Sequence, residues 1–124
     1  MQLINRTFHA WLDYLSCAVL LAAPWAFKFS GSNPAIAVSI GAGLFIFFSS
    51  IVTKYEGGLF RKMPMSMHLN LDVLLGIFLI ASPWVFSFHS KTQWVHVLFG
   101  VLAVLSGLLT VRKSTQRSSA IENI

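Results

Sequence analysis

Charged side chains are scarce in this sequence. Lysine, arginine, aspartate and glutamate make up 10% of the 124 residues, against 56% hydrophobic residues, and the mean hydropathy is +0.71. Soluble domains carry about 25% charged residues. The composition therefore excludes an ordinary soluble domain and is typical of a membrane protein. Cysteine is rarer still, because Cys17 is the only one. An internal disulfide is thus excluded, and the apolar run around Cys17 predicts a buried, unreactive thiol.

Motifs of soluble catalysis are also missing. The sequence has no glycine-rich phosphate loop, no zinc-type cluster of cysteine and histidine, and no paired carboxylates expected in one cleft. We therefore predict no catalytic residue, no cofactor and no metal site. The net charge of +5 does not indicate a nucleic-acid partner, because the basic residues stand at the ends of apolar runs, where they set membrane topology.

One stretch of the sequence occurs twice. Leu69–Phe88, LNLDVLLGIFLIASPWVFSF, has a partner in Trp11–Phe29. A shift of 59 positions places Trp11 on Asn70 and Phe29 on Phe88 without a gap. An internal repeat of this kind predicts two copies of one structural unit. The matched residues include four pairs: His9 with His68, Asp13 with Asp72, Pro24 with Pro83, and Trp25 with Trp84.

Four apolar runs predict the fold. They cover about residues 12–29, 35–52, 69–88 and 94–111, and about 20 helical residues cross a hydrocarbon core of about 30 Å. We expect an all-α, integral membrane four-helix bundle of two tandem parallel two-helix repeats, with Asn33 and Thr92 as matching helix caps. The predicted segments are a cytoplasmic lead (1–10), the first repeat (11–53), a cytoplasmic linker (54–68), the second repeat (69–112) and a cytoplasmic tail (113–124).

The distribution of basic residues predicts the orientation. Seven of the nine lie on one side of the expected spans and two on the other, so by the positive-inside rule both termini and the linker face the cytoplasm. This predicts a multi-pass protein of the cytoplasmic (inner) membrane. Its partner is then the lipid bilayer, and a homo-oligomer or a larger membrane partner stays open. The seven residues are Arg6, Lys54, Arg61, Lys62, Arg112, Lys113 and Arg117.

Proline occurs at the same position in the first and third expected helices, which both run away from the cytoplasm in the predicted topology. Pro24 and Pro83 each remove an N–H and free the carbonyl four residues earlier, of Leu20 or Leu79. Near a membrane surface such a carbonyl can meet water. A kink followed by an aromatic anchor at the interface is therefore the simplest interpretation. Carbonyls that bind an ion or a substrate are the alternative.

The proline motif also resembles a known family. The repeated Ala-[Ala/Ser]-Pro-Trp-x-Phe-x-Phe, with an aspartate eleven residues before each proline, is similar to the SPW-repeat family of small bacterial integral membrane proteins. Ser82, Pro83 and Trp84 match the family's name, whereas Ala23 precedes the first Pro-Trp, so both halves cannot need that serine hydroxyl. The resemblance covers about residues 9–112. It implies residence in a bacterial membrane and a two-helix repeat, and it carries no established activity.

A histidine just before each repeat is followed four residues later by an aspartate. His9 with Asp13, and His68 with Asp72, share a helix face and can meet. Each aspartate is expected in the first turn of its helix, where the dipole favours a carboxylate by about 0.3–1 kcal/mol. The alternatives are a polar contact between helices, a proton relay, and two pairs that offer ligands to a cation. His96 is expected to be an ordinary residue of the opposite interface.

Small residues at helical spacing predict which faces pack. Lipid tails give membrane helices little hydrophobic reason to associate, so close backbone approach at small residues is the usual substitute. The second and fourth spans carry such residues and are expected to form the packed interior or a subunit contact. The expected packing residues are Ala37, Gly41, Gly43, Gly100, Ala103 and Gly107.

The function expected from these features is non-enzymatic. An accessory, assembly or scaffold subunit is favoured, because the predicted spans lack a polar path through the membrane. The first alternative is a small oligomeric transporter or channel for protons or cations that uses Asp13 and Asp72. The second is a membrane enzyme whose acid and base groups are the two His/Asp pairs.

Overall fold

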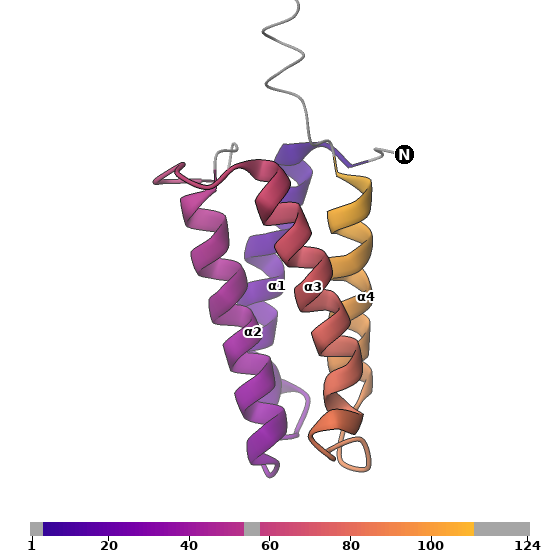
Figure 1. Cartoon of the computed structure of the whole chain (residues 1–124). Helices are drawn as coiled ribbons and strands as arrows, with labels where there is room; N and C mark the ends of the chain where they lie inside the picture. Colours follow the sequence, from indigo (N-terminus) through magenta and orange to yellow (C-terminus); the bar gives the residue numbers. More distant parts are fainter. Residues whose placement is uncertain (1–3, 54–57, 111–124) are drawn as a thin grey trace, which may run out of the picture.

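The computed structural model describes residues 4–53 and 58–110, which form a bundle of four helices (Figure 1). α1 packs chiefly on α2 and α3 on α4, and α1 and α3 start at the end where α2 and α4 finish. We call this the N-terminal end of the bundle and the opposite one the loop end. The predicted all-α four-helix bundle is confirmed. The helices are α1 (Arg6–Ala26), α2 (Asn33–Val52), α3 (Met65–Val85) and α4 (Trp94–Leu109).

Some predictions concern residues that the structure does not describe. Residues 54–57 of the expected linker and the expected tail lie outside the described ranges. So do four of the seven basic residues that predict the orientation, and the orientation therefore stays a prediction. These four are Lys54, Arg112, Lys113 and Arg117.

α1 and α3 begin earlier than the expected repeats. Asn5 caps α1 by accepting a hydrogen bond from the backbone N–H of Phe8 at 2.7 Å, and α3 begins at Met65. Asp13 and Asp72 are therefore each the eighth residue of their helix, and neither first turn contains an acidic residue. The expectation that the helix dipole holds these carboxylates is wrong, because the dipole acts mainly within the first turn.

The two proline-containing helices end in the same way. Just beyond the ends of α1 and α3, Lys28 and Ser87 adopt left-handed conformations with φ of 62° and 58°. The following N–H groups, of Phe29 and Phe88, bond back to the proline carbonyls at 2.9 and 2.8 Å. This is a Schellman-type helix end. It turns both phenylalanines into the core, where they are buried.

Two different serines bond the carbonyls that the prolines free. The Leu20 carbonyl accepts from Ser39 Oγ of α2 at 2.6 Å, whereas the Leu79 carbonyl accepts from Ser82 Oγ at 2.8 Å. Leu20 and Leu79 are fully buried, so the expectation that these carbonyls meet water is wrong. A buried carbonyl without a partner costs about 1–3 kcal/mol. Ala23 can thus replace the serine of the motif because Ser39 supplies the hydroxyl in the first half.

The second helices of the two halves match at an offset of 57 positions and not 59. Thr53 follows α2 and Thr110 follows α4, and each hydroxyl donates to the carbonyl of the serine four residues earlier. Gly43 and Gly100 each pack against the first helix of their own half. At offset 59 Gly100 would match Gly41, yet a Cβ on Gly41 meets nothing within 4 Å. The ungapped repeat is therefore wrong beyond the first helices, because the first half has two more residues between its proline and the matching glycine (Pro24 to Gly43) than the second half has (Pro83 to Gly100).

The helix caps match at neither offset. Ser32 caps α2, with its hydroxyl accepting from the N–H of Ala35 at 3.4 Å, and Asn33 is already the first helical residue. Gln93 precedes α4 without a side-chain cap. The predicted matching caps Asn33 and Thr92 are therefore wrong, since the two connections differ in length.

Glycines let α3 and α4 approach closely. A Cβ on Gly76 would lie 2.5 Å from the Gly100 carbonyl oxygen, and one on Gly107 would lie 2.7 Å from that of Leu69. No side chain fits in either place without moving the helix backbones apart. Gly100 and Gly107 therefore pack as predicted, whereas the sequence analysis did not single out Gly76.

The small residues of α2 divide into two sets. Gly43 packs on α1, where an added Cβ would lie 3.2 Å from the Cys17 carbonyl oxygen. Ala37 and Gly41 are exposed and line a groove between α2 and α3. These two residues are therefore not part of the packed interior, and a subunit contact at Ala37 and Gly41 stays a prediction.

An apolar core fills the loop half of the bundle, and it includes a histidine. His96 is fully buried, its ring lies 5.2 Å from that of Phe29 and 4.7 Å from that of Phe88, and Nε2 lies 3.1 Å from the Ala35 carbonyl oxygen. The expectation that His96 is an interfacial residue is wrong, because the shifted register turns it inward. Cys17 is buried, as predicted. Other core residues are Leu20, Ala23, Leu79 and Val95.

Two of the described helices are long and apolar enough to cross a membrane. They are α2 and α3, with mean hydropathies of 2.3 and 1.6, and α4 is a shorter apolar helix. Together with the composition of the chain, these helices point to a membrane protein.

Candidate functional site

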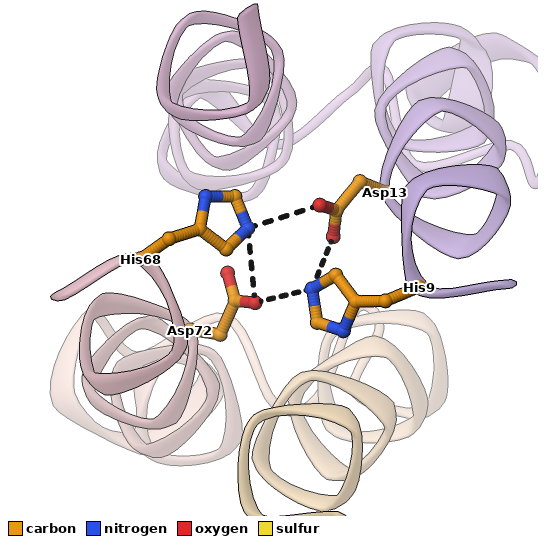
Figure 2. Close-up of side chains that lie close together, drawn as sticks. All are labelled: His9, Asp13, His68 and Asp72. Atoms are coloured by element: carbon orange, nitrogen blue, oxygen red, sulfur yellow. Dashed lines mark hydrogen bonds and ion pairs between the residues drawn. The ribbon is translucent and has the colours of Figure 1, made fainter. Parts of the chain in front are cut away.

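Four ionisable side chains meet inside the N-terminal end of the bundle (Figure 2). α1 contributes His9 and Asp13, and α3 contributes His68 and Asp72. We call these four residues the quartet. They converge because a spacing of four places each pair on one helix face, and both helices turn that face inward. Both histidines are 0% exposed, and Asp13 and Asp72 are 6% and 3% exposed.

The quartet forms a closed ring in which histidine and aspartate alternate (Figure 2). His9 Nε2 lies 2.8 Å from Asp72 Oδ2 and 3.1 Å from Asp13 Oδ1. His68 Nε2 lies 3.0 Å from Asp13 Oδ2 and 3.3 Å from Asp72 Oδ2. The shorter contact of each histidine crosses to the other helix. Of the interpretations open in the sequence, the polar contact between helices is confirmed.

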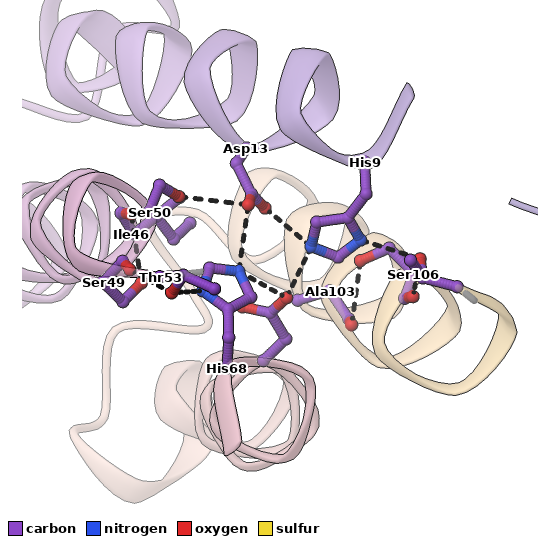
Figure 3. A network of polar contacts seen from close by, with 11 residues as sticks. His9, Asp13, Ile46, Ser49, Ser50, Thr53, His68, Ala103 and Ser106 are labelled. Carbon is purple, nitrogen blue, oxygen red and sulfur yellow. Dashed lines mark hydrogen bonds and ion pairs between the residues drawn. The ribbon is translucent and has the colours of Figure 1, made fainter. Parts of the chain in front are cut away.

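A threonine contacts each imidazole on the side away from the carboxylates, as Figure 3 shows for Thr53 and His68. His9 Nδ1 lies 2.8 Å from Thr110 Oγ1, and His68 Nδ1 lies 2.8 Å from Thr53 Oγ1. Each threonine already donates its one hydroxyl hydrogen to a serine carbonyl, so its oxygen can only accept from the imidazole. Nδ1 therefore carries a hydrogen in both histidines, and Nε2 is the atom that faces the carboxylates.

The surroundings of the two aspartates differ. Asp13 Oδ2 accepts from Ser50 Oγ at 3.0 Å. At the matching place beside Asp72 stands Gly107, where an added Cβ would lie 3.4 Å from Asp72 Cβ. A cavity of about 20 Å³ adjoins both carboxylates and is lined by Ala103 among others, which is room for about one water molecule.

Charge balance in the ring calls for two positive charges. Two ionised aspartates place two negative charges in a buried site, and a buried charge without a partner costs several kcal/mol. An Nε2 atom with only a lone pair would face oxygen lone pairs, which makes no hydrogen bond. A proton on each histidine, or a cation between the donor atoms, therefore has to join the nitrogens to the oxygens. Either solution leaves the ring neutral.

The sequence analysis found the members of the quartet and left their meeting open, as a polar contact between helices or as joint ligands of a cation. The donor atoms all lie within 4.8 Å of one another, so the expected absence of paired carboxylates in one place is wrong, whereas the predicted absence of a metal site stays a prediction. The repeat itself was the available signal, because two equivalent helices place equivalent residues at the same depth. The hydroxyl groups behind the ring were missed. A shared spacing in the sequence could have revealed them: Gly43, Ser49 and Thr53 are spaced as Gly100, Ser106 and Thr110 are.

The Pro-Trp residues lie at the loop end, away from the quartet. Pro24 and Pro83 are buried, whereas Trp25 and Trp84 are exposed. The Trp84 ring stacks on His89 with 6.2 Å between centroids and an interplanar angle of 11°. Exposed tryptophans at one end of the bundle suit the predicted interface anchor, which stays a prediction. Within the motif, Ser82 has a structural role as the hydroxyl donor to the Leu79 carbonyl.

Comparison with known proteins agrees with the repeat. A model of the SPW repeat domain matches residues 7–110. No curated protein and no solved structure matches the chain. The match spans all four helices and includes every residue of the quartet and of both Pro-Trp motifs. From this match and from the two-fold arrangement of α1 and α3 around the ring, the chain belongs to the SPW repeat family.

Proposed function

We propose that this chain is a small, non-enzymatic, multi-pass protein of the bacterial cytoplasmic membrane, with an accessory, assembly or scaffold role, in which the quartet fixes how the two repeats pack. The observation that carries the proposal is the closed ring of histidine and aspartate. α1 and α3 pack mainly on α2 and α4, and the ring supplies strong contacts directly between them.

The enclosure of the quartet supports a non-enzymatic role. An acid or base catalyst has to come within hydrogen-bond reach of its substrate. All four side chains are buried, and the adjoining cavity of about 20 Å³ holds about one water molecule. A substrate larger than water has no room beside the ring in this arrangement.

The transport alternative, in which Asp13 and Asp72 carry protons or cations, has support at only one end of the bundle. A relay through a membrane needs polar groups at successive depths. Beyond the quartet, the core of the loop half consists mainly of apolar side chains, among them the fully buried Leu20 and Leu79. We therefore favour the structural role over conduction through a single chain.

A cytoplasmic location of both termini puts the quartet near the cytoplasmic face of the membrane. Among the described residues, Arg6, Arg61 and Lys62 stand at the starts of α1 and α3, which is the N-terminal end, whereas Lys28 and Lys91 follow the ends of these helices, at the loop end. This difference has the sign that the positive-inside rule requires. An accessory role also needs a partner, either a second copy of the chain or a larger membrane protein.

Two experiments test the proposed role. Purification of the tagged chain from its native membrane, after mild cross-linking, should recover a second copy or another membrane protein at a fixed ratio. Liposomes that contain the purified chain should show no more proton or cation flux than empty liposomes. A flux that disappears in folded Asp13→Asn and Asp72→Asn variants would make transport the better explanation.

A further inference from the structure

We propose that the quartet is a binding site for one divalent transition-metal ion of the Zn²⁺ class. The ligands are Nε2 of His9 and His68 and one carboxylate oxygen each of Asp13 and Asp72. This inference deepens the proposed structural role and rests on it, because the ion fastens α1 to α3 at the same ring. Ligands from both repeats make the site dependent on the complete bundle.

The donor atoms already surround one centre. Neighbouring nitrogen and oxygen atoms of the ring lie 2.8–3.3 Å apart, and all donors lie within 4.8 Å of one another. A tetrahedral ion with bonds of about 2.0–2.1 Å places neighbouring donors about 3.4 Å apart. The contacts between neighbours therefore have to lengthen by at most about 0.6 Å. The Asp13 carboxylate, which faces the two histidines with different oxygens, has to turn one of them toward both, so that the longer separations shorten. The small cavity beside both carboxylates lies where such a movement needs space.

The hydrogen bonds that His9 and His68 make on the side away from the carboxylates are those of metal-binding histidines. Histidines that bind metal donate their other ring N–H to an oxygen, which fixes the ring and its tautomer. Thr110 and Thr53 accept that hydrogen bond at 2.8 Å from His9 and His68. In this tautomer the Nε2 lone pairs point toward the carboxylates. Ser50 orients the Asp13 carboxylate by the donation described above.

The charge of the site matches a divalent ion. Two neutral imidazoles, two carboxylates and an ion of charge +2 sum to zero, which is the balance that a buried site requires. The neighbouring helices add no charge at the ring. α2 contributes the hydroxyls of Ser50 and Thr53, and α4 contributes that of Thr110. α2 has no ionisable side chain, and His96 of α4 lies in the core of the loop half.

The ligand set selects the class of metal. Ca²⁺ and Mg²⁺ prefer six or more oxygen ligands, and this ring offers two nitrogens and two oxygens. Soft ions such as Cu(I) prefer sulfur, and the sulfur of Cys17 is engaged with the Tyr14 carbonyl oxygen at 3.1 Å. Imidazole with carboxylate in a four-coordinate arrangement suits Zn²⁺ and its spectroscopic substitute Co²⁺.

Titration of the purified full-length chain tests the inference. After treatment with a chelator, the detergent-solubilised protein should bind one Zn²⁺ per chain, and Co²⁺ should give the intense visible absorption of tetrahedral coordination. Zn²⁺ at about 100 times its Kd should raise the melting temperature by about 10 °C. Mg²⁺ at the same concentration should not raise it.

Three variants separate the quartet from accidental binding. Asp72→Asn should abolish the one-to-one binding of Zn²⁺. Thr110→Val keeps all four ligands but removes the acceptor for His9 Nδ1–H, so binding should weaken about 10–100-fold. His89→Gln, which removes an exposed imidazole outside the quartet, should bind as the natural chain does.

Either of two results would overturn the metal site: a folded natural chain that binds no Zn²⁺, or Asp72→Asn and Thr110→Val variants that bind it unchanged. The structural role has its own test, since Asp72→Leu should destabilise the metal-free chain. If the natural chain binds no Zn²⁺ but Asp72→Leu still destabilises the metal-free chain, only the metal site is refuted. A metal-free Asp72→Leu chain as stable as the natural one would remove the structural role.

Discussion

Replacing Asp72 should distinguish an ion-paired ring from an ordinary polar contact. In Asp72→Leu, His9 Nε2 loses its 2.8 Å partner, and both imidazoles are left with the single carboxylate of Asp13 at 3.1 and 3.0 Å. Each nitrogen keeps one oxygen of Asp13, but a single negative charge then faces two protonated imidazoles. Breaking a buried ion pair by removing one member costs about 3–5 kcal/mol.

Asp72→Asn is the matched variant, because it keeps the shape of the side chain and removes only the charge. The amide N–H can donate to the lone pair of a neutral His9, so a hydrogen bond survives. A bond to a charged group contributes about 1.5–3 kcal/mol and a neutral one about 0.5–1.5 kcal/mol. The expected loss of stability is therefore about 1–1.5 kcal/mol.

Thermal unfolding of the metal-free chain in detergent, followed by circular dichroism, measures both losses. A chain of this length unfolds with an entropy that converts 1 kcal/mol into about 4 °C of melting temperature. Asp72→Leu should therefore melt about 12–20 °C below the natural chain and Asp72→Asn about 4–6 °C below it. Equal melting of the two variants, or a Leu variant within about 4 °C of the natural chain, would refute the ion-paired ring.

Four further outcomes follow, three from the fold and one from the predicted topology. Gly100→Ala should lower the melting temperature by about 4–12 °C, because overpacking costs about 1–3 kcal/mol and the new Cβ would lie 2.7 Å from the Gly76 carbonyl oxygen. Gly41→Ala should leave the melting temperature unchanged or raise it, since the new Cβ meets nothing within 4 Å and alanine favours helix. If Gly41→Ala and Gly100→Ala lower the melting temperature equally, the two glycines are equivalent and the ungapped repeat is correct. Ser82→Ala should also cost about 1–3 kcal/mol in the same melting assay, because the buried Leu79 carbonyl loses its donor, and an unchanged melting temperature would contradict that account. A periplasm-active reporter should work when inserted at Ser32 but not at the C-terminus, and the reverse result would invert the proposed topology.

The sequence by itself determined the fold class and the first helix of each half. Scarce charge and four apolar runs indicate a helical membrane protein because each run has the length and composition of a span. The offset of 59 positions correctly matches α1 with α3, including the helix ends at Lys28 and Ser87. These features depend on neighbours within one helix, whose periodicity fixes which residues share a face.

The sequence determined less about the site. The spacing of four predicts that His9 meets Asp13, and they do meet, at 3.1 Å. The shorter contact of His9 is with Asp72, 63 residues away. Local spacing shows which side chains share a face, but it does not show which face of another helix stands opposite.

The tertiary structure decided the register of α2 and α4 and the hydroxyl groups behind the ring. A shift of two residues rotates a helix face by about 200°. The two additional residues between Pro24 and Gly43, compared with Pro83 and Gly100, therefore turn Gly41 outward and Gly43 inward. The same shift brings Thr53 and Thr110 to equivalent places behind the two histidines. A side chain is placed against another helix by the lengths of the connections and by the packing of whole helices. The periodicity of a single segment determines neither the lengths of the connections nor the packing of the helices. The arrangement of the ring is therefore seen only in the folded chain.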